Sequence, residues 1–187
     1  MAARYAVRVR VLGVDPGLRL TGYGCVDGLG ERPALVEAGV LRLGAPRGRG
    51  SDRTRRPPDA ASVSARLAEL DGDFRGLLDR LRPEVVAVES LFAHYKHPAT
   101  AIVMGHARGV LLLAIRSAGV RLVEYRPNEV KKSLTGFGHA SKEQMQSAVQ
   151  AFFELAAPPE PPDVADALAV ALCAARRLAV DPIEAER

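Results

Sequence analysis

The stretch from Arg10 to Val26 constrains the fold more than any other part of the chain, because it places an acid at the end of a buried strand. Its first half is an apolar run that ends at Asp15, where Pro16-Gly17 predicts a tight turn. The turn is so short that the next strand, at about residues 21–26, must return antiparallel to the first. Asp15 is therefore expected at a sheet edge, on a rigid support.

A second apolar run ends on an acid in the same way. The segment Glu84-Val-Val-Ala-Val-Glu89 is typical of a short buried strand, and the apolar periodicity of residues 63–81 predicts a helix before it that Pro83 ends. A helical crossover is what parallel pairing of two strands requires, and open α/β sheets hold their sites at the carboxyl edge. We expect Asp15 and Glu89 to meet at that edge.

The remaining segments predict an α/β fold with a mixed five-stranded sheet flanked by helices. The first three strands should form an antiparallel meander, and the fourth and fifth should run parallel. The further segments are a third strand at 34–43, an apolar helix at 101–115 after Pro98, a fifth strand at 120–125, a short helix from Pro127 to the Gly136-Phe-Gly138 segment, a helix behind a capping box at Ser141 to Gln144, and a last helix from Asp163.

Length and composition favour one domain with a nucleic-acid partner. A chain of 187 residues is expected to form one domain, 1–187, with a flexible basic loop at about 44–60 and a frayed tail beyond Asp181. The net charge of +4 is concentrated in that arginine-rich loop, whereas the acids of interest are dispersed. Basic surface around acidic points indicates a polyanion met by a metal-holding centre. Whether the loop contacts phosphate or is only solvated stays open.

Apolar runs and cysteines bear on the compartment. No run is long enough to cross a membrane, and the first ten residues lack a hydrophobic signal segment, so we expect a soluble, cytoplasmic protein without membrane contact. Cys25 and Cys173 match neither a disulfide framework nor metal-ligand spacing, and both are expected to be buried small apolar groups.

Two further acids, Asp163 and Asp166, open the last helix. Residues three apart on a helix face the same way, so both carboxylates can point at one spot with Asp15 and Glu89. Four carboxylates suit Mg²⁺ or Mn²⁺, and two such ions about 4 Å apart can hydrolyse a phosphodiester. Taken singly, Asp15 is also a plausible turn residue and Asp163 a plausible helix N-cap.

Several motifs occur together in order between residues 9 and 175, and they carry a resemblance. They are Val11-Leu-Gly-Val-Asp-Pro-Gly17, Thr21-Gly-Tyr-Gly24, Val88-Glu89 followed by Phe92, Gly105-His-Ala-Arg-Gly109, Val130-Lys131 with Gly136-Phe-Gly138, and Asp163-Val-Ala-Asp-Ala-Leu-Ala169. In this order and spacing the chain resembles the RuvC family of Holliday-junction resolvases.

The resemblance implies an RNase H-like fold and a homodimer that cuts two strands of a four-way DNA junction symmetrically. It further implies a branch-migration helicase as partner. The cofactor expected with the four acids is Mg²⁺ or Mn²⁺, with two ions per active site. The catalytic and metal-binding residues would be Asp15, Glu89, Asp163 and Asp166. The DNA-binding residues would be Phe92, which would stack on a base near the crossover, Lys131 and Lys142 near the scissile DNA, Lys96, and Arg108, whose role is unassigned.

Two other functions compete with a metal-dependent nuclease. A catalytically silent nucleic-acid-binding module would bind DNA in a salt-dependent way without nicking it. In ATPases of the actin and sugar-kinase type, the first phosphate-binding loop also follows a strand and contains an Asp-x-Gly turn. The segment from Gly13 to Gly17 matches this loop loosely. Such ATPases need two large lobes and a second phosphate loop, which 187 residues do not supply.

The apolar helix around residues 110–115 is expected to form much of a dimer contact.

Overall fold

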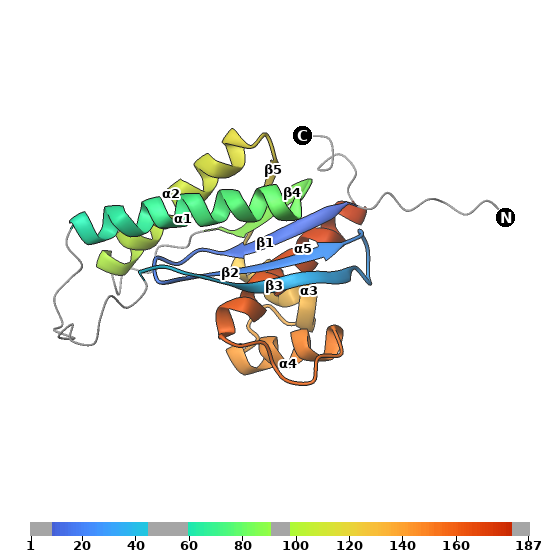
Figure 1. Ribbon diagram of the computed structural model, residues 1–187. Coiled ribbons are helices and arrows are strands. Elements are labelled where there is room, and N and C mark those ends of the chain that lie inside the picture. Colours follow the sequence, from blue (N-terminus) through green and yellow to red (C-terminus); the bar gives the residue numbers. More distant parts are fainter. Residues whose placement is uncertain (1–8, 45–59, 91–97, 181–187) are drawn as a thin grey trace.

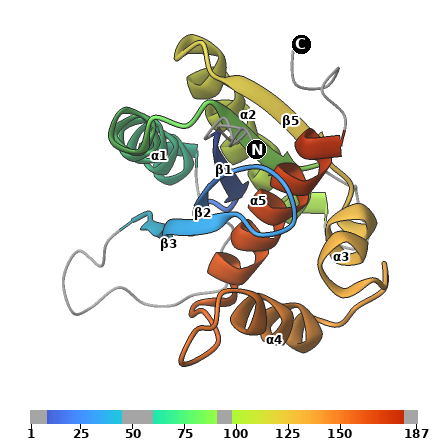
Figure 2. The ribbon, with the colours of Figure 1, turned by 90° about the vertical axis from the view of Figure 1, so that its right-hand side faces the viewer.

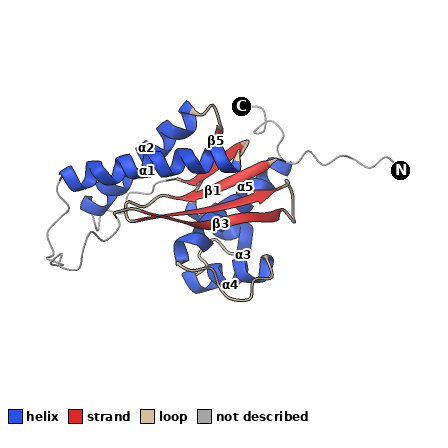
Figure 3. Cartoon of the chain, viewed as in Figure 1, coloured by secondary structure: helices blue, strands red, loops and turns tan. Residues whose placement is uncertain are grey.

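A mixed five-stranded sheet forms the centre of the computed structural model, which describes residues 9–44, 60–90 and 98–180 (Figure 1). Its strands are β1 (Arg10–Asp15), β2 (Leu20–Asp27), β3 (Ala34–Arg42), β4 (Val85–Glu89) and β5 (Arg121–Tyr125). The helices are α1 (Ala60–Leu81), α2 (Pro98–Ser117), α3 (Pro127–Thr135), α4 (Lys142–Phe152) and α5 (Pro162–Val180) (Figure 3).

The strand order β3-β2-β1-β4-β5 confirms the predicted topology. Strands β1, β2 and β3 form the antiparallel meander, and β4 pairs parallel with both β1 and β5. The proposed basic loop and the tail beyond Asp181 lie outside the described residues, apart from the ends of the loop at 44 and 60. Within the described ranges, no helix is long and apolar enough to span a membrane.

Helices cover both faces of the sheet, because the strand side chains alternate between two apolar layers. Leu12 and Val14 of β1 pack with α1 and α2 on one face, whereas Val11 packs with α5 on the other. Viewed from the side, α1 and α2 lie on one side of the sheet and α5 on the opposite side, next to α3 and α4 (Figure 2). This alternation also fixes the face on which the last residue of each strand projects.

Helix α5 lies unusually close to the sheet because glycines in β1 and β2 leave room for its backbone. A Cβ atom built on Gly13 would lie 2.2 Å from the carbonyl oxygen of Ala167, and one on Gly22 would lie 2.1 Å from that of Asp163. Both contacts are far below any real Cβ separation, so only glycine allows this approach. The glycines thereby set how far the acids of α5 stand from those of the sheet.

The predicted C-terminal end of α3 and N-terminal end of α4 are confirmed. Gly136 ends α3 in the left-handed region, with φ of 75°. Ser141 caps α4: the backbone N–H of Gln144 donates to its hydroxyl, and its own N–H donates to the Gln144 side chain at 2.8 Å. The cap fixes the direction of the next residue, Lys142. Cys25 and Cys173 are free and buried, as expected.

We predict that Gly13→Ala lowers the free energy of unfolding by about 1 to 3 kcal/mol or more, because the added methyl group meets helix backbone that cannot yield. Gly72→Ala is the matched control, since nothing lies within 4 Å of its Cβ position in the exposed face of α1. That substitution should stabilise the protein by up to about 1 kcal/mol through helix propensity. Urea unfolding of both variants measures the difference, and equal changes would contradict close packing of α5.

Candidate active site

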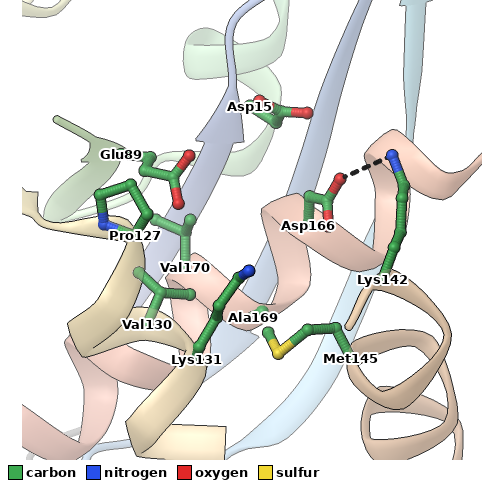
Figure 4. A pocket seen from close by; sticks show the side chains of 10 residues that line it. All are labelled: Asp15, Glu89, Pro127, Val130, Lys131, Lys142, Met145, Asp166, Ala169 and Val170. Carbon is green, nitrogen blue, oxygen red and sulfur yellow. Dashed lines mark ion pairs between the residues drawn. The ribbon is translucent and has the colours of Figure 1, made fainter. Parts of the chain in front are cut away.

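The ends of β1 and β4 place two carboxylates side by side at the carboxyl edge of the sheet. The parallel register pairs Val14 with Val88, so the residue that follows in each strand, Asp15 or Glu89, reaches the same edge. Val14 and Val88 both face α1 and α2, so strand alternation turns both acids toward α5. The prediction that these two acids meet is confirmed, and Figure 4 shows them on the same cavity.

The first turns of α5 bring the other two acids toward this edge. Asp166 lines the same cavity as Asp15 and Glu89. Asp163 lies over Gly22, which is the cross-strand partner of Asp15. It is close enough that its charge raises the pKa of Asp15, although it is not among the residues that line the cavity. The structure therefore gathers all four predicted acids but puts three of them on one cavity wall.

The cavity has a volume of about 300 Å³, and its charged lining consists of three carboxylates and two lysines (Figure 4). Lys142 pairs with Asp166, at 3.4 Å between Nζ and the carboxylate oxygen. Lys131 points into the space between Glu89 and Asp166. The complete lining is Asp15, Glu89, Pro127, Val130, Lys131, Lys142, Met145, Asp166, Ala169 and Val170.

Burial and neighbouring negative charges raise the pKa of the Asp15 carboxyl group. Its pKa rises from the ordinary 3.8 to about 7, first because burial disfavours the charged form and then because Asp166, Asp163 and Glu89 repel its charge. The pKa of Glu89 is also raised, chiefly by burial and then by Asp166, although Lys131 and Arg108 act in the opposite direction. The edge of the sheet therefore carries negative charge that a cation would stabilise.

The donor set fits a hard divalent cation. Carboxylate oxygens are the ligands that Mg²⁺ and Mn²⁺ prefer, and a bound cation would relieve the repulsion that raises the pKa of Asp15. Among the residues that the structure describes, no group of three or more acids, histidines or cysteines is arranged closely enough to hold a metal ion as it stands. That the four acids form one metal-binding site therefore stays a prediction: three of them share a cavity, and Asp166 is paired with a lysine.

The position of Lys142 cannot be explained by helix stability. It is the first residue of α4, where the helix dipole disfavours a positive charge by a few tenths of a kcal/mol or more. Lys142 nevertheless points to the carboxylates, together with Lys131 from α3. Positive side chains beside a cluster of acids suit an anionic group that approaches the cavity from outside. The pairing of Lys142 with Asp166 has no signal in the sequence, because it depends on how α4 packs on α5.

Of the other three predicted DNA-binding residues, the structure describes only Arg108. Phe92 and Lys96 lie outside the described residues. Arg108 is only 7% exposed and points inward to the backbone of Glu89 and to Glu124, so the expectation of a DNA contact there is corrected. The sequence also did not indicate that apolar residues of α3, α4 and α5 form part of the cavity wall. One of them, Met145, was predicted only as a member of a buried stripe.

Comparison with known proteins identifies the family. The family model described as crossover junction endodeoxyribonuclease RuvC matches residues 11–174. A Rhodopirellula baltica protein of that name is 43% identical over 174 residues, which cover 93% of this chain and 89% of the relative. A Moorella thermoacetica protein of the same name is 46% identical over 164 residues, which cover 87% of this chain and 89% of the relative.

Solved structures agree with this result. The structure of Thermus thermophilus RuvC superposes with a TM-score of 0.73 at 32% identity, covering 92% of this chain and 96% of that one. T. thermophilus RuvC in complex with a Holliday junction substrate superposes with a TM-score of 0.71 at 28% identity and the same coverage. A yeast mitochondrial Holliday junction resolvase, 14% identical with a TM-score of 0.63, shares the fold. The expected RNase H-like fold is confirmed.

We predict that Asp15→Asn stabilises the metal-free protein at neutral pH but not in acid. Because the pKa of Asp15 is raised to about 7 in the folded state, the carboxyl is protonated in both states below about pH 4, and folding gains nothing from the amide there. As the pH rises from about 4 to about 7, the wild-type protein loses up to about 4 kcal/mol of unfolding free energy that the variant keeps, and above about pH 7 the difference stays constant. Urea unfolding in a chelator at about pH 5 and pH 8 tests this; an equal difference at both would contradict it.

Proposed function

The chain belongs to the RuvC family of crossover junction endodeoxyribonucleases, and we propose that Asp15, Glu89, Asp163 and Asp166 are the acids with which it hydrolyses DNA. As a member of that family it is a nuclease that resolves four-way (Holliday) junctions. One observation supports the site assignment most strongly: two strand ends and the first turns of α5 bring these acids to one edge of the sheet, facing Lys131 and Lys142.

We propose Mg²⁺ or Mn²⁺ as the cofactor, with two ions for each site. Members of this family depend on a metal ion, and oxygen ligands select these two ions. Asp15, Glu89 and Asp166 would hold the ions from the cavity wall, and Asp163 from the first turn of α5. When bound, the ions supply an activated water and stabilise the leaving oxygen of the phosphodiester. The whole described chain serves as one nuclease domain in this proposal.

The two lysines have a different task from the acids. Lys142 neutralises Asp166 in the metal-free protein, and Lys131 brings a second positive charge between Glu89 and Asp166. We infer that both turn to the DNA strand when it enters, so that the scissile phosphate is held at the rim of the cavity. Phe92, Lys96 and the arginine-rich loop at about 44–60 remain predicted DNA contacts.

We propose that α2 forms the contact of a homodimer. A junction has two equivalent strands to cut, and a two-fold protein presents the same site to each. The outer side of α2 carries Ile102, 61% exposed, and Leu113, 62% exposed. Between them, the Cβ positions of Gly105 and Gly109 have nothing within 4 Å, which leaves room for a second helix to approach. Large apolar side chains on an open helix face suit a second copy of the chain.

Two further expectations follow from the family membership. A branch-migration helicase is proposed as the partner that supplies the junction, and the cytoplasm as the compartment in which it is cut. The family membership leaves no role for the ATPase alternative. The family membership equally disfavours a DNA-binding module without catalysis, which serves only as the contrary outcome in the test of the site.

Glu89→Gln is predicted to lower the rate of junction cleavage by roughly 100-fold to 1,000-fold, because it removes a charge worth several kcal/mol to the transition state. Junction binding should change little, since the amide keeps the size of the side chain. The measurement is cleavage of a synthetic four-way junction, beside a plain duplex, in Mg²⁺ and Mn²⁺. Glu84→Gln at the opposite end of β4 is the control and should cut normally. Normal cleavage by Glu89→Gln would refute the site, and no cleavage by the wild-type chain would favour the silent module.

Leu113→Glu is predicted to convert the dimer to monomers, because it puts a charge on the apolar face of α2 that a second copy would bury. Light scattering after gel filtration measures the molar mass. The control is Val36→Glu, which charges a 40% exposed residue of β3 and should leave the dimer intact. A dimer in the Leu113→Glu variant would place the contact elsewhere.

A further inference from the structure

Arg108 is a buried charge that reaches from α2 to the strand end carrying Glu89. Only 7% of the residue is exposed. One guanidinium nitrogen donates to the backbone carbonyl of Glu89 at 2.6 Å, and the other forms an ion pair with the Glu124 carboxylate of β5. Arg108 therefore contacts both strands at the edge of the sheet where the acids gather.

The carbonyl that Arg108 binds lies at the point where β4 leaves the sheet. The ladder between β1 and β4 ends at Val14 and Val88, one residue before Glu89. On the β5 side, the N–H of Ser90 donates to the carbonyl of Tyr125 at 2.8 Å. The peptide group that joins Glu89 to Ser90 is thus held at its N–H by β5 and at its carbonyl by Arg108. With both ends bound, this peptide plane has little freedom to rotate.

The side chains of Arg108 and Glu89 lie on opposite faces of the sheet. Glu89 projects toward α5, whereas α2 and Glu124 lie on the other face, where Leu122 and Glu124 alternate with Val123 and Tyr125. Besides the effect of its charge on the pKa of Glu89, Arg108 therefore acts on the direction of that carboxylate through the backbone. A rotation of the Glu89 peptide would swing the carboxylate within the cavity, and small displacements of a reacting group are costly in rate.

Packing alone does not account for an arginine at this position. The neighbouring positions of α2 on the sheet side are Ala107, Leu111, Ala114 and Ile115, all fully or almost fully buried. Burying a guanidinium is unfavourable unless its hydrogen bonds are well made, and apolar replacements of buried ion pairs are often neutral or stabilising. An apolar residue would fill the space in α2, but it would leave the carbonyl of Glu89 without this donor.

We propose that Arg108, oriented by Glu124, is a positioning residue that fixes the peptide group of Glu89 and so the direction of its carboxylate in the cavity. The proposal rests on the function proposed above, in which Glu89 is a catalytic acid. It assigns to Arg108 a part in catalysis without contact to DNA or to the reacting atoms. It also makes Glu124 a supporting residue, although nearly half of the Glu124 side chain is exposed.

The test compares Arg108→Met, Arg108→Lys and Glu124→Gln with the wild-type protein. Arg108→Met keeps an unbranched apolar stem but removes the guanidinium and both hydrogen bonds, and we expect it to lower kcat for junction cleavage by about 10-fold to 100-fold, the range typical of residues that orient metal ligands. The Kd for the junction and the KM should stay within about 2-fold, because Arg108 is buried and its hydrogen bonds are made within the protein. Arg108→Lys, which keeps a charged donor, should restore part of kcat, and Glu124→Gln should lose about 3-fold to 10-fold. Arg75→Met, which breaks the exposed Arg75–Asp71 pair on α1, is the matched control and should leave kcat unchanged.

A second measurement does not depend on cleavage. The rise in Tm that Mn²⁺ produces, titrated by differential scanning fluorimetry, should need about 10-fold to 100-fold more Mn²⁺ at its midpoint in Arg108→Met. Wild-type kcat in Arg108→Met, or an unchanged Mn²⁺ midpoint, overturns the proposal. If Arg108→Met does not fold, the Glu124→Gln variant is measured in its place. A wild-type kcat and a wild-type Mn²⁺ midpoint in Glu124→Gln would then overturn the proposal. If the wild-type chain cuts no junction, the proposed function fails, and the Mn²⁺ midpoints still decide whether Arg108 orients Glu89.

Discussion

The approach of α5 to the sheet is the constraint on which the rest of the structure depends. Backbone of the helix rests directly on Gly13 and Gly22, at distances that no Cβ atom would permit. Alanines on the facing side of α5 complete the contact, and all of Ala167, Ala171 and Ala174 are inaccessible. Because this contact fixes the distance between α5 and the sheet, it also fixes the distance between Asp166 and Asp15. Placing carboxylates together is unfavourable, and a rigid backbone contact is what maintains such an arrangement.

Most of the fold follows from the sequence because local patterns determined it. The apolar run before Asp15, the Pro16-Gly17 turn and the helix between residues 63 and 81 predict β1, β2, the crossover and the parallel pairing of β4. Once two strands are parallel and adjacent, acids at their ends must meet. The proximity of these two acids could therefore be predicted from the sequence. The capping box at Ser141 and the end of α3 at Gly136 could be predicted in the same way.

What the sequence did not reveal depends on distances between elements. The spacing of Asp163 and Asp166 correctly indicated a shared helix face, but only the height of α5 above β2 decides that Asp166 lines the cavity and Asp163 does not. Likewise, Arg108 lies in a segment that suggested a DNA contact, and its inward direction follows from how α2 crosses β5. Pairing of Lys142 with Asp166 has the same origin, since it requires α4 and α5 to be packed together.

The order of the acids along the chain has a consequence for biosynthesis. Asp15 belongs to β1 and Asp166 to α5, so the cavity cannot exist before α5 has been synthesised and has packed on the sheet. A nascent chain that ends before α5 also exposes the glycine-lined face of β1 and β2, which α5 covers in the finished protein. Completion of this core and assembly of the cavity are therefore the same folding event, because both wait for α5 to pack on the sheet.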